Sequence, residues 1–151
     1  MNNSEIVAQE TNNAVAKLPL LAAVVALVGL FDSIYLTTKH FAGAAVPCTV
    51  LEGCEQVLTS SYAEVAGVPL AALGAIAYFA AFSLAILAAF GNRLMWTLFS
   101  VQVVFMTIFT IWLVYLQASV IGAYCQFCLL SAATTLILFV ITLISKFRHS
   151  K

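Results

Sequence analysis

Four long runs of apolar residues divide the chain, and few charged side chains interrupt them. The runs cover residues 18–38, 68–90, 94–117 and 125–145. A helix needs about 20 apolar residues to cross roughly 30 Å of hydrocarbon, and each run reaches that length. Backbone polar groups in lipid must be paired internally, which a helix achieves within one segment. The pattern therefore predicts an all-α membrane protein, a four-transmembrane-helix bundle.

Polar segments flank and separate these runs. Residues 1–17 are rich in Asn and acidic side chains without a period that would bury one face, so we expect a flexible cytoplasmic tail. Residues 39–67 are expected to form a long outer loop, in which residues 55–66 could make a short interfacial helix. The membrane domain then covers residues 18–146, and residues 147–151 form a second cytoplasmic tail.

The remaining connections are short. Gly91, Asn92 and Arg93 indicate a tight turn, and residues 119–124 form an uncharged connection to the last run. The second run is rich in Ala and contains Gly74, which favours close approach of neighbouring helices.

A cleaved signal peptide is the competing interpretation of the first run, because residues 42–44 (Ala-Gly-Ala) resemble a small-residue cleavage site. However, the run is longer than the usual apolar region of about 7–15 residues, and a long leader precedes it. Asp32 also interrupts it. We therefore favour a retained membrane helix.

Composition agrees with an integral membrane protein of one domain. Hydrophobic residues make up 64% of the 151 residues and charged residues 8%, with a net charge of zero. No basic cluster stands out, so nothing indicates a nucleic-acid partner or a polybasic contact with lipid headgroups.

Basic residues near the ends of the runs indicate the orientation. An even number of spans places both termini on one side, where five basic residues gather, while Lys39 alone lies on the other. The five are Lys17, Arg93, Lys146, Arg148 and Lys151. The positive-inside rule then puts both termini in the cytoplasm. We expect a bacterial inner membrane with the cysteines facing the oxidising periplasm; in a eukaryote that side would be the ER lumen.

All four cysteines fall on the outer side, in two pairs. Cys48 and Cys54 lie in the first outer loop, where Gly53 eases a turn that could close a small disulfide ring. Cys125 and Cys128 form a C-x-x-C that opens the fourth run. There the first cysteine lies near a helix N-terminus, whose N–H groups and macrodipole favour the thiolate that disulfide exchange requires.

Two structural disulfides or a zinc site are the alternatives to redox chemistry. A disulfide within a C-x-x-C along a helix is easily reduced and stabilises the fold little. A bundle of four packed spans also has little need of stabilising disulfides. The C-x5-C arm is looser than common zinc sites, and a charged metal site is costly in a membrane. We favour an electron relay without a metal. A membrane scaffold or transporter subunit with purely structural disulfides is the alternative function.

Further motifs accompany the two cysteine pairs. Thr59-Ser60-Ser61 follows the first pair, and Gly67-Val68-Pro69-Leu70 with Gly74 enters the second run. The segment at residues 30–37, LFDSIYLT, ends the first run. Together with the cysteine order, these motifs resemble the vitamin K epoxide reductase (VKOR) family, and residues 30–37 resemble its bacterial members. The resemblance covers residues 28–131.

The resemblance implies a thiol–disulfide oxidoreductase that passes electrons from a thioredoxin-fold (DsbA-like) protein to a membrane quinone. The quinone would be ubiquinone, menaquinone or a vitamin K type. Cys48 would engage the partner in a mixed disulfide, Cys54 would pass electrons to Cys125, and Cys128 would face the quinone. Many bacterial members carry a fused thioredoxin-like domain. The sequence reaches Lys151 without one, so we expect a bacterial-type homologue with a separate redox partner.

One departure from the family bears on the substrate. Animal members have a tyrosine four residues after the second cysteine of the C-x-x-C, where this chain has Ala132. This difference argues against assuming vitamin K epoxide as substrate and favours quinone reduction during protein disulfide formation. A DsbB-type oxidase shares that chemistry but usually carries its C-x-x-C in the first outer loop, and here the order is reversed.

Five more residues are candidates for the quinone site. Phe31 and Phe127 could form its walls, although Phe at helical spacing is more often plain packing. Ser33 and Ser60 could donate hydrogen bonds to a quinone carbonyl. Placing a charged side chain such as that of Asp32 within a span costs on the order of 3 kcal/mol of insertion free energy. Asp32 is either a polar partner of the thiols or quinone that influences protonation, or a hydrogen-bonded structural acid.

Overall fold

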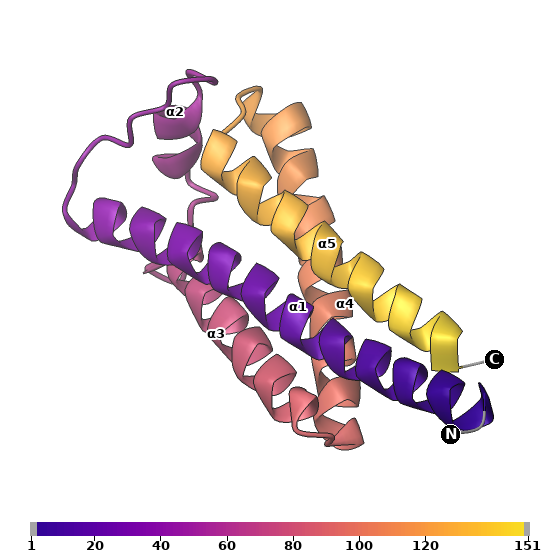
Figure 1. The fold of residues 1–151 in the computed structure, drawn as a ribbon. Helices are drawn as coiled ribbons and strands as arrows, with labels where there is room; N and C mark the ends of the chain where they lie inside the picture. Colours follow the sequence, from indigo (N-terminus) through magenta and orange to yellow (C-terminus); the bar gives the residue numbers. More distant parts are fainter. Residues whose placement is uncertain (1–2, 150–151) are drawn as a thin grey trace.

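The computed structural model describes the backbone of residues 3–149 and the side chains of residues 17–148. Four of its helices are long and apolar enough to cross a membrane, and a loop with a short helix lies between the first two (Figure 1). The predicted fold class is therefore confirmed. The helices are α1 (Asn3–Phe41), α2 (Cys54–Leu58), α3 (Leu70–Ala89), α4 (Arg93–Leu116), the π-helix η1 (Gln117–Ile121) and α5 (Gln126–His149).

The first helix is longer than the sequence indicated. We expected residues 1–17 to be a flexible tail, but α1 begins at Asn3 and continues into the span Lys17–Phe41. Extending a helix that is already nucleated costs far less than starting one, and this segment holds Ala, Glu and Gln residues that favour helix. Pro19 lies inside α1 and removes one N–H donor near the start of the span.

The outer loop differs from the helix that we predicted over residues 55–66. The helix α2 ends at Leu58, where Thr59 and Ser60 donate their hydroxyls to carbonyl oxygens of the preceding turn. An antiparallel hairpin of β1 (Glu64–Val65) and β2 (Val68–Pro69) follows. Its two loop residues, Ala66 and Gly67, both have positive φ, as the tightest hairpin turns require.

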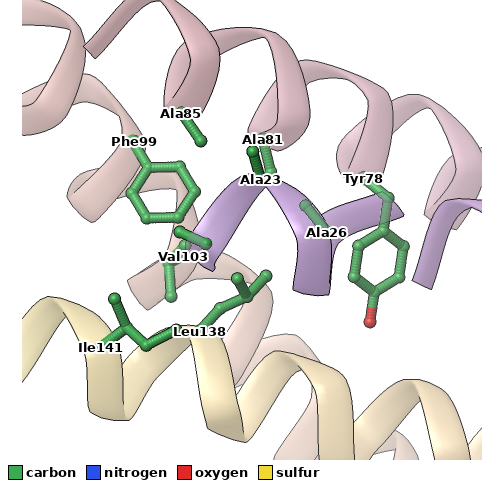
Figure 2. Packing of buried hydrophobic residues seen from close by; sticks show 10 residues of the cluster. Ala23, Ala26, Tyr78, Ala81, Ala85, Phe99, Val103, Leu138 and Ile141 are labelled. Atoms are coloured by element: carbon green, nitrogen blue, oxygen red, sulfur yellow. The ribbon is translucent and has the colours of Figure 1, made fainter. Parts of the chain in front are cut away.

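Small residues bring α1 and α3 together. Ala22, Ala26 and Gly29 lie on one face of α1, and the two alanines are fully buried. A Cβ on Gly29 would lie 2.3 Å from the ring of Tyr78, so only glycine fits there. Figure 2 shows Ala23 and Ala26 of α1 close to Ala81 and Tyr78 of α3. This close packing is the usual means of helix association in lipid.

Hydrogen bonds between helices complete the bundle. The hydroxyl of Tyr78 donates to the carbonyl oxygen of Ser131 on α5 at 2.7 Å. It also lies between 2.8 and 3.0 Å from the hydroxyls of Ser131, Thr134 and Thr135. Figure 2 shows the Tyr78 side chain reaching from α3 toward α5. Gln102 Nε2 of α4 donates to the Ala77 carbonyl oxygen of α3 at 2.7 Å.

The fourth span joins the third through an irregular segment. We expected an uncharged connection over residues 119–124, but α4 passes directly into the π-helix η1. Gly122 then ends the helical path in the left-handed conformation. Both ends of the chain lie at one end of the bundle, and α2 lies at the other, beside the first turn of α5 (Figure 1).

Candidate redox site

Cys125 and Cys128 lie at the start of α5, at the end of the bundle opposite the chain termini, which we call its outer end. Cys125 immediately precedes the helix and is completely buried, while Cys128 is one turn further in and partly buried. Neither forms a disulfide in this structure. The Cys125 carbonyl oxygen accepts a hydrogen bond from the backbone N–H of Leu129, so the motif is already in helical register.

The environment of Cys125 favours its thiolate. A hydrogen bond with the Cys128 thiol lowers the pKa of Cys125 to about 7, and the backbone N–H groups of Phe127 and Cys128 act in the same direction. Burial and the negative charge of Asp32 oppose this effect. Such a thiolate is both a nucleophile and a good leaving group in disulfide exchange.

The loop cysteines form the ring that the spacing suggested. Cys48 and Cys54 are joined by a disulfide, with their Cα atoms 6.2 Å apart. Cys54, the first residue of α2, is buried, whereas Cys48 is partly exposed. The pair therefore has one sulfur turned toward the bundle and one nearer to water.

The ring rests against the start of α5. The backbone N–H of Val50 donates to the side-chain oxygen of Gln126 at 3.1 Å. A Cβ on Gly53 would lie 2.8 Å from the backbone oxygen of Tyr124. The absence of a side chain at Gly53 thus lets the ring approach the segment just before the C-x-x-C. On the other side, the Gln117 side-chain oxygen accepts a hydrogen bond from the Cys125 backbone N–H at 3.3 Å.

All four cysteines belong to one hydrophobic cluster. Buried Cys54 and Cys125 form its centre together with Val57 and Ala123, and Cys48 and Cys128 pack against it. The structure therefore brings together the two pairs that lie more than 70 residues apart in the sequence. Because Cys48 and Cys54 already share a disulfide, their sulfurs are not available as zinc ligands in this state.

A cavity of about 490 Å³ extends from Cys128 into the outer half of the bundle. Asp32, Ser33 and Ser60, three of the predicted quinone contacts, line it together with Cys128. The other walls include many apolar side chains of α3 and α4, among them Leu73, Phe105, Met106, Phe109 and Leu113. Ala132 lies in the wall as well. The volume lies within the range of ligand pockets, which are usually lined by apolar groups with a few polar ones.

The two phenylalanines lie outside the lining of this cavity. Phe31 is 65% exposed and points away from the bundle. Phe127 packs against the cysteine cluster and against Tyr35, with the ring centroids 5.3 Å apart. Aromatic walls come instead from Phe105 and Phe109 of α4.

Reasoning from the sequence missed the glutamines that position the cysteines. Gln117 is buried within an apolar helix, and a buried amide in a span is a detectable signal, because it must find partners. Gln126 sits inside the C-x-x-C and gave no separate signal. The role of Tyr78 was also missed. The cost of burying its hydroxyl in a span is offset by hydrogen bonds with the hydroxyl groups of α5.

Comparison with known protein families agrees with this arrangement. The model of the vitamin K epoxide reductase family matches residues 20–143, which include all four spans in whole or in large part and all four cysteines.

Proposed function

Because the chain belongs to the vitamin K epoxide reductase family, we propose that it transfers electrons from a thioredoxin-fold protein to a membrane quinone and so supports protein disulfide formation. Membership implies a thiol–disulfide oxidoreductase embedded in the membrane. The identity of the redox partner, the identity of the electron acceptor and the direction of electron transfer are what we propose here.

The observation that carries the proposal is the single cluster of four cysteines beside a cavity. Exchange requires a thiolate to attack a disulfide through a mixed intermediate, so the sulfurs must be able to meet. Cys54 and Cys125 are buried in the same cluster, which supports transfer between them. Cys48, partly exposed, is suited to meet a soluble partner, and Cys128 lines the cavity.

The proposed order follows from these positions. The partner's thiolate opens the Cys48–Cys54 disulfide by attack on Cys48, and the partner leaves oxidised. Cys54 then attacks Cys125 in the disulfide of the helix pair, which forms a Cys54–Cys125 mixed disulfide and releases Cys128. Cys48 attacks Cys54 in this intermediate, the Cys48–Cys54 disulfide forms again, and Cys125 leaves as a thiolate, a role that its lowered pKa favours. The reduced helix pair finally gives two electrons to the quinone at Cys128.

The cavity supports a quinone as acceptor. A quinone head is a flat, mostly apolar ring with two carbonyl oxygens, and the cavity offers apolar walls with few polar groups. Ser33 and Ser60 are the proposed hydrogen-bond donors, and Ala132 leaves space where animal members of the family are expected to have a tyrosine. The quinone supplies the redox chemistry, while the helix bundle positions the quinone and keeps water out of the site.

The proposed location is a bacterial inner membrane with the cysteines on the periplasmic side. Five of six basic residues lie toward the end of the bundle that holds the termini, by sequence position, and the cysteines lie at the other end. The partner is then a periplasmic, DsbA-like protein.

Two variants test the proposal. Cys128→Ser should abolish quinone reduction while the protein still inserts and folds, because only one sulfur atom is replaced. In Cys54→Ala, Cys48 is a free thiol that attacks the disulfide of the oxidised partner, and Cys54 is absent and does not displace the partner again, so the attached partner can be identified by mass spectrometry. A Cys128→Ser protein that reduces quinone normally would instead support a scaffold or transporter subunit with structural disulfides.

A further inference from the structure

Asp32 presents a buried, unpartnered oxygen in the wall of the cavity that holds Cys128. Its side chain is only 8% exposed, and Oδ2 has no hydrogen-bond partner among the described residues. It is the one buried side-chain N or O atom in that state within residues 17–148. Buried polar atoms are nearly always paired, so an orphan indicates a group that receives a ligand, a water or a proton.

Within residues 17–148, no Lys or Arg side chain lines the cavity beside the carboxyl group. The ion pair found among the described side chains joins His40 to Glu64. The titratable side chains that line the cavity with Asp32 are His40, Tyr62, Tyr78 and Cys128. The hydroxyl of Tyr78 is committed to α5, and His40 is paired with Glu64 at the outer end. Tyr62 is 47% exposed, which leaves Cys128 as the thiol that shares the cavity with Asp32.

Asp32 and Cys128 line the same cavity. The hydrogen bond with the Cys128 thiol has the largest effect on the pKa of Cys125, and the negative charge of Asp32 acts on that pKa in the opposite direction. Ser33, its neighbour in sequence, is buried against α3 near Gly74, which fixes the face of α1 that carries these two side chains.

We propose that the carboxyl group of Asp32 carries a proton from the Cys128 thiol to the quinone during reduction. This inference rests on the proposed function. It assigns a catalytic role to a residue that takes no part in the thiol–disulfide exchange itself. General bases of this kind must be within reach of the proton that they take and must be free of competing partners. The orphan oxygen of Asp32 has no competing partner.

The helix pair begins as two thiols, one S–S bond forms between Cys125 and Cys128, and two electrons pass to the quinone. Asp32 takes the Cys128 proton and gives it to one quinone oxygen. Cys125 releases its proton to water when it ionises, and the second quinone oxygen takes one proton from water. The products are the Cys125–Cys128 disulfide and hydroquinone.

Single-turnover kinetics of the reduced protein separate this role from a structural one. The full-length protein is reduced, mixed with a short-chain quinone in detergent, and followed by the absorbance change of hydroquinone formation. Asp32→Asn keeps the shape but cannot carry the proton, and Asp32→Glu keeps the acid. Thr107→Val is the matched control, because it removes a buried hydroxyl of α4 outside the cavity.

The limiting rate of quinone reduction should fall about a hundredfold or more in Asp32→Asn, the usual range for loss of a general base. The quinone concentration for half-maximal rate should stay nearly unchanged, Asp32→Glu should restore part of the rate, and Thr107→Val should match wild type. Transfer from the loop pair to the helix pair should be normal in Asp32→Asn. Its unfolding midpoint should equal or exceed that of wild type, because the substitution removes an unpaired acidic group from the membrane domain.

Three results would overturn the role. A normal limiting rate in Asp32→Asn excludes proton transfer by this residue. A rise in the half-maximal quinone concentration at an unchanged limiting rate makes Asp32 a binding group only. A lower unfolding midpoint with both half-reactions slowed equally makes it a structural acid. If wild type forms no hydroquinone, the proposed function fails and this inference fails with it.

Discussion

Around Ala22, Ala81 and Phe99 the four helices pack in one buried hydrophobic cluster, whereas around Asp32 and Cys128 the same helices surround a cavity of about 490 Å³. The inner half contains small residues in close contact (Figure 2). The outer half contains a buried acid with an unpaired oxygen, a π-helix and two thiols.

This difference separates stability from function within one bundle. Close packing in the inner half holds the helices in a fixed arrangement, because tightly packed interiors do not deform continuously. The outer half keeps polar groups and empty volume that cost stability, and such features gather where a protein binds or reacts. Substitutions in the two halves should therefore have separable effects on activity and on stability.

Among substitutions that keep all four cysteines and Asp32, the largest effect on activity is expected from Gly53→Val in the outer loop. Its backbone has an ordinary negative φ, so valine is not strained by conformation, but a Cβ would collide with the Tyr124 backbone at 2.8 Å. The ring would be lifted from the start of α5. Misplacement of reacting atoms by about 1 Å can cost on the order of a hundredfold in rate.

Stopped-flow measurement of transfer from the reduced loop pair to the oxidised helix pair checks this expectation. Glu52→Ala, an exposed neighbour in the same ring, should leave the rate unchanged. Normal transfer in Gly53→Val would show that contact with Tyr124 does not position the ring.

The largest effect on stability is expected from Gly29→Ala between α1 and α3. The added Cβ would lie 2.3 Å from the Tyr78 ring, and overpacking of this kind usually costs about 1–3 kcal/mol. Equilibrium unfolding in mixed detergent micelles measures the change. Val28→Ala, at a largely exposed neighbouring position, should change the free energy of unfolding by less than about 0.5 kcal/mol. Equal effects of the two variants would contradict the packing described for α1 and α3.

A smaller loss of stability is expected from Tyr78→Phe. This change keeps the ring against Gly29 but removes the hydroxyl that bonds to Ser131, Thr134 and Thr135. Hydrogen bonds between membrane helices contribute about 0.6–2 kcal/mol. The same unfolding assay, with Tyr115→Phe on an exposed position as control, tests the value. No difference between the two variants would mean that the hydroxyl contributes nothing to holding α5.

The smallest measurable shift concerns the thiolate of Cys125. In a protein with Cys48 and Cys54 replaced by Ser, one thiolate should appear near pH 7, about 1.5 pH units below an ordinary thiol at about 8.5. A lowered pKa means that the thiolate persists to lower pH. Absorbance at the thiolate band during a pH titration reports it.

Cys128→Ala, made in that same background, should move the transition upward, because the hydrogen bond from Cys128 is the main cause of the lowering. An unchanged transition would assign the lowering to the N–H groups at the start of α5 instead.

The sequence predicted the four spans because the length of an apolar run is a local property. It also predicted that both cysteine pairs share one end, since an even number of spans alternates between two sides. The helix of α2 was predicted too long, because side-chain hydroxyls at Thr59 and Ser60 end it by contacts that composition does not reveal.

Side-chain direction was harder to predict than position along the chain. Phe31 and Ser33 are two residues apart, which places them on nearly opposite faces of α1. The stripe of Ala22, Ala26 and Gly29 marks the packed face, so Phe31 lies away from it and Ser33 toward it. Contacts between distant segments, such as Val50 with Gln126, depend on tertiary folding and left no pattern in the sequence.

In the proposed relay, every electron passes through an exchange between Cys54 and Cys125. A protein with Cys48→Ala and Cys128→Ala retains only these two cysteines, which lie in one buried cluster. On mild oxidation in the membrane, mass spectrometry of digested peptides should find a Cys54–Cys125 disulfide in most molecules, and prior unfolding in detergent should greatly reduce it. If both thiols instead stay reduced in the folded protein, the two pairs do not exchange and the relay is wrong.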